Sequence, residues 1–313
     1  MTNQRKINRS RFYFEWKGHQ IQDLETFHAI TVAQRPDKPI VYLAGDSSLD
    51  NKYWVSSDEA LEETPDIYKH TLDNPQPKPD VSFWLNHFLG DRATCINTAV
   101  EESMLRQRDQ ELLAHDKFIR DNIKPQDVLI VSIGANDIAL KPLPCTIRHM
   151  LQLAWATPRS SLEKGTAWSL KYFKHMFGNN IQDYVDRVTA KTRPRAVIIC
   201  MIYYPLESGL GQQSWADVQL KALGYNTWPG QLQTAIKTLY EIATQNIKVE
   251  GTEIVPCALH EVLDGKTARD YTARVEPNEH GGKKMAQKFV ELLNAVWTEG
   301  LAARGPQDDH AGM

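Results

Sequence analysis

Two short polar segments follow apolar runs and carry side chains that could perform acyl-transfer chemistry. The first is Gly45-Asp46-Ser47-Ser48, which comes directly after the apolar run 39–45. The glycine permits a tight turn, and a serine at the mouth of a sheet can be a nucleophile whose backbone N–H helps to stabilise an oxyanion. Alone, these residues also suit an ordinary turn or a helix cap.

The second segment is Gly134-Ala135-Asn136-Asp137, at the end of the apolar run 127–134. A side-chain amide at the end of a strand can donate a hydrogen bond to a developing negative oxygen. In isolation, a turn that caps the following helix explains the same residues. Found together at the ends of two neighbouring strands, the two segments are far more specific, and they make Ser47 and Asn136 candidate catalytic residues.

The elements that must position these residues alternate along the chain. The apolar runs are near-continuous in Val, Ile, Leu and Cys, which is typical of strands buried on both faces. They cover residues 39–45, 93–100, 127–134, 195–205 and 253–259. Between and after them, helical patterns cover residues 81–89, 104–123, 231–247 and 282–297. This order predicts a three-layer α/β/α fold with a mainly parallel five-stranded sheet.

The chain is expected to form one domain at residues 39–298, preceded by an N-terminal extension, 1–38, and followed by a disordered tail, 299–313. Three connections are long enough to be insertions, and the second and third are rich in aromatic residues. These insertions cover about 48–80, 141–190 and 206–230. Their aromatic side chains could line a substrate pocket or form a lid, and they could equally build a small core of their own.

Composition limits the classes of partner. The chain has 36 Lys and Arg against 39 Asp and Glu, a net charge of -3, which argues against nucleic acid. No run of about 18 apolar residues and no secretory apolar region is found, so we expect a cytoplasmic protein without a transmembrane segment. The four cysteines form no C-x-x-C pair, and we expect neither a metal nor another cofactor. The oligomeric state stays open.

The two polar segments resemble the first and third sequence blocks of the SGNH hydrolases, also called GDSL-type esterases or lipases. The resemblance implies a flavodoxin-like α/β/α fold and hydrolysis of an ester or thioester bond. It also implies that Ser47 is the nucleophile, that Asn136 is an oxyanion donor, and that the substrate is a small-molecule ester. The aromatic insertions suggest that this substrate has an apolar portion.

Two further blocks of that family match poorly. In the second block, at residues 97–103, Glu102 takes the place of a glycine whose N–H joins the oxyanion hole. A carboxylate there would oppose an oxyanion unless it points away or is paired. In the fourth block, Asp-x-x-His-Pro, Ala273 stands in place of the aspartate and Glu276 in place of the histidine. If a helix has begun by Pro277, His280 projects on nearly the same side as Glu276.

Three interpretations of the missing histidine follow. In the first, which we prefer, His280 is the base, oriented by Glu276 or Glu279. In the second, Glu276 accepts the proton itself, which requires burial to raise its pKa from about 4.3. In the third, preferred over the second, there is no base, and the scaffold binds a ligand or partner without turnover. His260 is the best substitute base.

Overall fold

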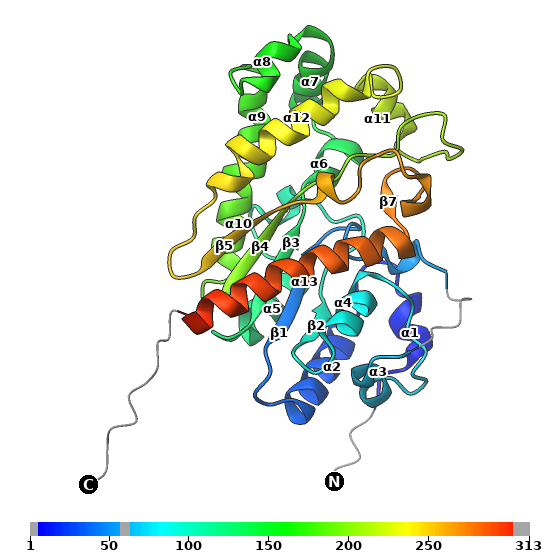
Figure 1. Ribbon diagram of the computed structural model, residues 1–313, viewed down its shortest axis with the longest axis vertical. Helices are drawn as coiled ribbons and strands as arrows, with labels where there is room; N and C mark the ends of the chain where they lie inside the picture. The colour runs from blue at the N-terminus through cyan, green and yellow to red at the C-terminus, as the bar shows by residue number, and fades with distance from the viewer. Residues whose placement is uncertain (1–5, 57–62, 303–313) are drawn as a thin grey trace.

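The computed structural model describes residues 6–56 and 63–302, and a parallel sheet lies at its centre (Figure 1). The five strands are hydrogen-bonded in the order β2-β1-β3-β4-β5. They are β1 (Ile40–Gly45), β2 (Thr94–Asn97), β3 (Val128–Ser132), β4 (Ala196–Met201) and β5 (Glu253–Ala258). The predicted α/β class and all five predicted strands are confirmed. This strand order belongs to the flavodoxin-like arrangement, which places ligands at the carboxyl ends of the strands.

Two helices cover one face of the sheet, α4 (Val81–Leu89) and α13 (Glu279–Ala302), and Figure 1 shows α13 lying across the strands beside α4. Alternate strand residues such as Leu43 and Ile130 form one buried cluster with Phe289 of α13. The opposite face is covered by α2 (Ile21–Gln34), α5 (Ala114–Asn122), α10 (Ile181–Val188) and α12 (Pro229–Ile242). Helices on both faces make this a three-layer domain.

The remaining elements are short. The helices α1 (Arg9–Phe14), α3 (Asp66–Thr71), α6 (Ala135–Ala139), α7 (Pro144–Leu151), α8 (Arg159–Glu163), α9 (Leu170–Lys174) and α11 (Asp217–Ala222) accompany a hairpin of β6 (Tyr271–Thr272) and β7 (Glu276–Pro277). Within the described residues, seven further single turns are 3-10 or π helices, η1 to η7. The segment 141–190 contains α10, so it includes the helix that connects β3 to β4. Residues 57–62 of the first predicted insertion lie outside the described residues.

One predicted helix, 104–123, is interrupted. A 3-10 turn, η2, covers Leu105–Arg108, and α5 begins only at Ala114. The Asp137 carboxylate accepts hydrogen bonds from the backbone N–H groups of Leu105 (2.7 Å) and Arg106 (3.2 Å), which holds this turn against the end of β3. A tertiary hydrogen bond therefore overrides the helical pattern.

The last helix, α13, begins after Pro277, and not by Pro277 as the sequence comparison of His280 with Glu276 assumed. Pro277 is not in the helix, because it pairs with Tyr271 in the β6–β7 hairpin. The Asn278 Oδ1 instead accepts from the backbone N–H groups of His280 (2.9 Å) and Gly281 (3.2 Å), which caps α13. The helix continues to Ala302, into the predicted tail, and residues 303–313 lie outside the described part of the chain.

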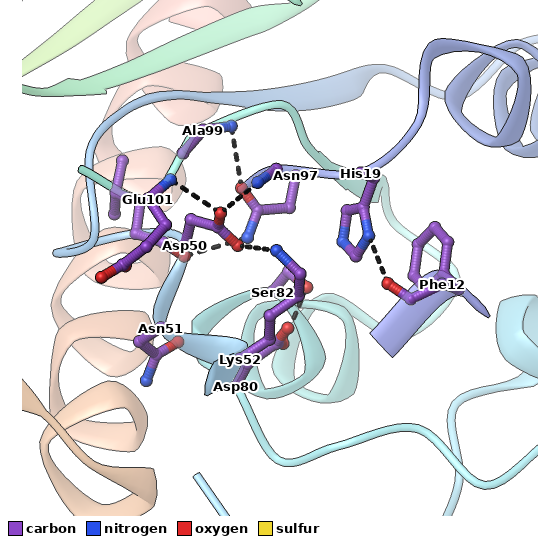
Figure 2. A network of polar contacts seen from close by, with 12 residues as sticks. Phe12, His19, Asp50, Asn51, Lys52, Asp80, Ser82, Asn97, Ala99 and Glu101 are labelled. Atoms are coloured by element: carbon purple, nitrogen blue, oxygen red, sulfur yellow. Dashed lines mark hydrogen bonds and ion pairs between the residues drawn. The ribbon is translucent and has the colours of Figure 1, made fainter. Parts of the chain in front are cut away.

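The buried carboxylate of Asp50, which forms an ion pair with Lys52, ties the N-terminal segment to the domain (Figure 2). Asp50 and Lys52 are fully buried, and the Lys52 Nζ lies 2.5 Å from the Asp50 Oδ1. The Asp50 Oδ2 accepts from the backbone N–H groups of Gly18 (2.8 Å) and Glu101 (2.9 Å). A buried carboxylate needs such partners to offset its desolvation. Asp50 thus joins three loops that are far apart in the sequence.

Candidate active site

Ser47 lies in a turn directly after β1, at the carboxyl end of the sheet. Gly45 makes this turn possible, because its φ is +140° and a Cβ there would stand 1.7 Å from the carbonyl oxygen of Ser132. The backbone N–H of Asp46 donates to the same oxygen at 3.1 Å. Ser48 Oγ lies 2.7 Å from both Asp46 Oδ1 and Ser132 Oγ. The turn is therefore held tightly around a buried Ser47.

Asn136 lies at the start of α6, after the end of β3. Its Nδ2 donates to the backbone carbonyl of Ser103 at 3.1 Å, and the Ser103 hydroxyl donates to the carbonyl of Gly45 at 2.8 Å. A primary amide has two donor hydrogens, so one remains for a ligand. The loops that follow β1, β2 and β3 are connected in this way around Ser47.

Glu276 reaches the same place from the β6–β7 hairpin. The turn of this hairpin contains two residues in the left-handed region, Ala273 (φ 49°) and Arg274 (φ 63°). The buried Arg274 side chain holds the turn by hydrogen bonds to the carbonyl of Leu206 and to the side chains of Asp217 and Asn226. The Glu276 side chain is only 2% exposed as a result.

The environment of Glu276 changes its acidity. Burial raises its pKa to about 7, and nearby Asp46 acts in the same direction. Interactions with the Ser47 hydroxyl and the Trp215 indole partly oppose this rise. The Trp215 Nε1 donates to Glu276 Oε1 at 3.1 Å, whereas Oε2 is buried without a hydrogen bond of standard geometry. A carboxyl group of pKa about 7 beside a serine is suited to exchange a proton with it.

A second buried carboxyl group, Glu101, belongs to the same site. Burial raises its pKa to about 9, and the charges of Glu276, Asp50 and Asp46 add to this rise. The Trp54 Nε1 donates to Glu101 Oε1 at 3.2 Å. Because its pKa lies well above 7, Glu101 is neutral near pH 7 and would not repel a negatively charged oxygen in the site.

Two hollows meet at Ser47. The wider, of about 750 Å³, is an aromatic and acidic cleft, and the narrower, of about 110 Å³, is mostly apolar. Four residues line both of them, namely Ser47, Asn136, Trp215 and Glu276. The structure thus brings three of the four predicted site residues to one place. It also identifies Trp215 as an aromatic residue of the third insertion that lines the site.

The other aromatic residues of the second and third insertions lie elsewhere. Phe173 and Phe177 are buried in the large core cluster, and Tyr225 is buried in a small separate one. Trp155 and Trp168 are about 60% exposed and line neither hollow. Tyr225, with Ala216 and Leu220, therefore forms the small separate core that was the alternative, whereas Phe173 and Phe177 belong to the main core.

The fourth predicted site residue, His280, lines neither hollow. Its Nε2 lies 3.3 Å from Glu279 Oε1 in the first turn of α13, and the side chain is 36% exposed. His260 lines neither hollow as well, since it packs against the rings of Tyr204 and Tyr240. Burial lowers the pKa of His260. Neither histidine is brought together with the other three residues.

Glu102, at the position where the resembling family has glycine, adopts a left-handed conformation with φ 59°. Its carboxylate is paired, because Oε2 lies 3.1 Å from the Lys17 Nζ. Glu102 is therefore one of the carboxylates that are paired, which is the condition under which it would not oppose an oxyanion. Lys17 comes from the N-terminal extension. The sequence around Glu102 contains no pattern that predicts this pairing.

Several residues of the site were missed at the sequence level. They are Tyr13, Phe14, Trp16, Tyr53, Trp54, Lys78, Glu101 and Leu140, which line the wider cleft together with Glu102. The aromatic run 12–16 could have indicated the residues from the N-terminal extension, since aromatic side chains in an otherwise polar segment usually pack against another part of the protein. The contribution of Glu101 had no signal beyond its place next to Glu102.

The described residues contain no cluster of His, Cys, Asp and Glu that could hold a metal ion. Cys95, Cys200 and Cys257 are buried free thiols, and Cys145 is exposed. No helix within residues 6–56 and 63–302 is long and apolar enough to cross a membrane.

Comparisons with known proteins give similarity at the level of structure. No protein-family model matches the chain, and no curated protein does. A lipase from a goat rumen metagenome matches with a TM-score of 0.46 and 11% identity, covering 83% of this chain and 97% of that one. An extracellular lipase from Streptomyces rimosus matches with a TM-score of 0.43 and 10% identity, covering 83% and 99%.

The aryl esterase of M. smegmatis matches with a TM-score of 0.41 and 11% identity, covering 82% of this chain and 99% of its own. A putative GDSL-like lipase from Bacteroides ovatus matches with a TM-score of 0.40 and 11% identity, covering 84% and 55%. The chain thus matches solved lipases and esterases, one of them of the GDSL type, over most of its length and at low sequence identity.

Proposed function

We propose that the protein is a serine hydrolase that cleaves an ester bond through an acyl-enzyme on Ser47, with Glu276 as the proton acceptor. The supporting observation is that Ser47, Asn136 and a Glu276 carboxyl of pKa about 7 line the same two hollows. A general base is most effective when its pKa lies near the working pH. The interpretation in which Glu276 is the base therefore replaces His280 as our preferred one.

The reaction begins when Ser47 Oγ attacks the ester carbonyl carbon and its proton passes to the Glu276 carboxylate. The carbonyl oxygen becomes an oxyanion and accepts hydrogen bonds from the Ser47 backbone N–H and the Asn136 amide, with the Glu102 N–H as a third donor. Glu276 becomes neutral as the oxyanion forms, so the site gains no net charge. This matters because Asp46 and Glu101 are close.

The intermediate then collapses. The bond between the carbonyl carbon and the alkoxy oxygen breaks, and Glu276 returns its proton to the leaving alcohol. A water molecule, deprotonated by Glu276, then attacks the acyl-enzyme. The bond between the carbonyl carbon and Ser47 Oγ breaks, Glu276 returns the proton to Oγ, and the acid product leaves. Two proton transfers by one carboxyl group complete each half-reaction.

The two hollows divide the substrate between them. The narrow one is lined by apolar residues of α6, α11 and α12, including Ala139, Leu220 and Ile236, and we assign the acyl group to it. Its volume of about 110 Å³ is below that of an apolar cavity of roughly 150 Å³ that holds benzene. The acyl group is therefore short. The alcohol portion occupies the wide cleft.

Filling the narrow pocket should change the preference for acyl length. In Ala139→Leu, we expect kcat/KM for a butyrate ester to fall by roughly tenfold relative to the acetate ester, since each lost methylene contact is worth about 1–3 kcal/mol. Steady-state hydrolysis of p-nitrophenyl esters measures this ratio. The exposed Ala222→Leu, on α11, is the control and should keep the wild-type ratio. An unchanged ratio in Ala139→Leu would contradict the assignment of the acyl group to the narrow hollow.

The pH profile of kcat/KM should be bell-shaped. Glu276 must be ionised to accept a proton, so activity is expected to rise tenfold per unit below pH about 7 and then level off. Above pH about 9, ionised Glu101 adds a negative charge beside the oxyanion, so activity should fall. The measurement is kcat/KM from pH 5 to 10, and Glu101→Gln should keep the acidic limb and lose the basic one.

The direct test of the function is labelling with a fluorophosphonate, located by peptide mass spectrometry. We expect the wild type to be labelled on Ser47 and to hydrolyse short-chain esters, and Ser47→Ala to do neither. The alternative is a ligand-binding protein without turnover. The absence of histidine from the lining of both hollows favours this alternative. A folded wild type that neither reacts with the probe nor hydrolyses any ester would support that alternative.

A further inference from the structure

The wide cleft contains a buried carboxyl oxygen that the proposed hydrolysis does not use. Glu101 is 4% exposed and lines the cleft, and while its Oε1 accepts from Trp54, its Oε2 is buried without a hydrogen-bond partner. An unpartnered buried carboxyl oxygen costs free energy unless a ligand or a proton satisfies it. Its position, in a cleft of about 750 Å³, leaves room for a ligand.

The rim of the same cleft already shows how this surface accommodates a cation. The Lys17 Nζ lies 3.1 Å from the Glu102 carboxylate and 4.7 Å from the centroid of the Trp16 ring. An ammonium group is attracted both by a carboxylate and by the face of an indole ring. Deeper in the cleft, Glu101 and Trp54 repeat this combination of carboxyl and indole, with no cation of the described chain paired to the carboxyl.

The charges around Glu101 favour a positive ligand. Glu276, Asp50 and Asp46 all raise its pKa through their negative charge. The charge of Asp50 is offset by Lys52, which lies at 2.5 Å. One further lysine, Lys78, also lines the cleft, and its Nζ donates to the backbone carbonyl of Lys52 at 2.7 Å.

The walls of the cleft are aromatic. Phe14, Tyr53 and Trp215 line it, with side chains exposed to 88%, 61% and 39%. Large exposed aromatic side chains concentrated in one cleft mark a binding surface. Together with the buried carboxyl group of Glu101, they suit methylated ammonium groups, which are apolar on the outside and carry a full charge.

We propose that the wide cleft binds an alkylammonium group through Glu101 and its aromatic walls, so that the preferred substrates are short-chain esters of an amino alcohol. The identification of this group with the leaving alcohol rests on the proposed function, in which Ser47, a lining residue of the cleft, attacks the ester. The binding of the cation itself does not depend on hydrolysis. A bound cation favours the ionised form of Glu101, and binding therefore releases a proton below pH about 9.

Binding is measured on Ser47→Ala, so that no ligand is consumed. Choline is titrated at pH 8 by tryptophan fluorescence and by calorimetry in two buffers of different ionisation enthalpy, against its uncharged isostere 3,3-dimethylbutan-1-ol. We expect choline to bind at least tenfold more tightly than the isostere, with proton release. Equal affinities for the two ligands would overturn the proposal.

The double variant Ser47→Ala, Glu101→Gln should lose at least tenfold in choline affinity and all of the proton release. The exposed Glu250→Gln, in the same background, is the control and should behave as Ser47→Ala does. Should the Glu101 variant fail to fold, Trp54→Phe tests the same contact, since it removes the indole that holds Glu101 and should weaken choline binding. Unchanged choline binding in a folded Glu101→Gln or Trp54→Phe protein would also overturn the proposal.

Hydrolysis by the wild type then separates this inference from the proposed function. If both hold, kcat/KM for butyrylcholine exceeds that for 3,3-dimethylbutyl butyrate by tenfold or more. Equal hydrolysis of the two esters would overturn the cation site and leave the esterase intact. Choline binding without hydrolysis of either ester would overturn the esterase and leave the cation site intact.

Discussion

Replacing Glu276 with glutamine is expected to lower kcat by roughly 10⁴-fold, because loss of a partner of a catalytic serine costs on the order of 10⁴ to 10⁶ in turnover. Glutamine has nearly the same shape as glutamate, and its amide oxygen can still accept from the Trp215 indole. The substitution therefore removes the proton acceptor and keeps the packing of the hairpin. The measurement is kcat for a p-nitrophenyl ester, with thermal unfolding to verify the fold.

The matched substitution is His280→Gln. His280 lies at the start of α13 and lines neither hollow, so we expect kcat to stay within about threefold of the wild type. The reverse result, a large loss in His280→Gln and a small one in Glu276→Gln, would restore histidine as the base. It would also require the first turn of α13 to move toward Ser47 when substrate binds.

Replacing Gly45 with alanine is expected to produce the largest loss of stability. The added Cβ would overlap the backbone carbonyl of Ser132, at 1.7 Å, and that carbonyl belongs to β3, the strand beside β1 in the sheet. Neither partner can move without breaking the turn that carries Ser47. We expect the free energy of unfolding to fall by about 4 kcal/mol or more, a loss that few single substitutions reach.

Gly209→Ala is the control for the backbone conformation alone. Gly209 also has a positive φ, 82°, but nothing lies within 4 Å of an added Cβ. Its expected cost is the left-handed conformation itself, about 1–2 kcal/mol. Urea unfolding of both variants gives the comparison. A Gly45 variant no less stable than the Gly209 variant would show that the turn after β1 relaxes easily.

The sequence by itself predicted the sheet and two members of the site. Strands buried on both faces must be apolar throughout, so their positions could be read from local composition. The carboxyl ends of parallel strands meet at one edge, and this places the residues after β1 and β3 together. Ser47 and Asn136 could therefore be named as neighbours without coordinates.

The acid–base residues could not be chosen in this way. His280 and Glu276 lie four residues apart, and they would project on nearly the same side if the helix had begun by Pro277. The structure puts Glu276 in a hairpin and His280 in the helix after it, because Pro277 pairs with Tyr271 and Asn278 caps α13. A pKa of about 7 for Glu276 is the product of burial, which depends on every neighbour and appears in no local pattern.

The wide cleft depended even more on tertiary contacts. Its walls come from the N-terminal extension, from the loop after β1 and from the third insertion, and a buried Asp50 joins the first of these to the loop that carries Glu101. Interactions across such sequence separations are set by packing and buried polar partners. The sequence determined the sheet and the place of Ser47 at its edge, and the tertiary structure alone decided which carboxyl groups surround that serine.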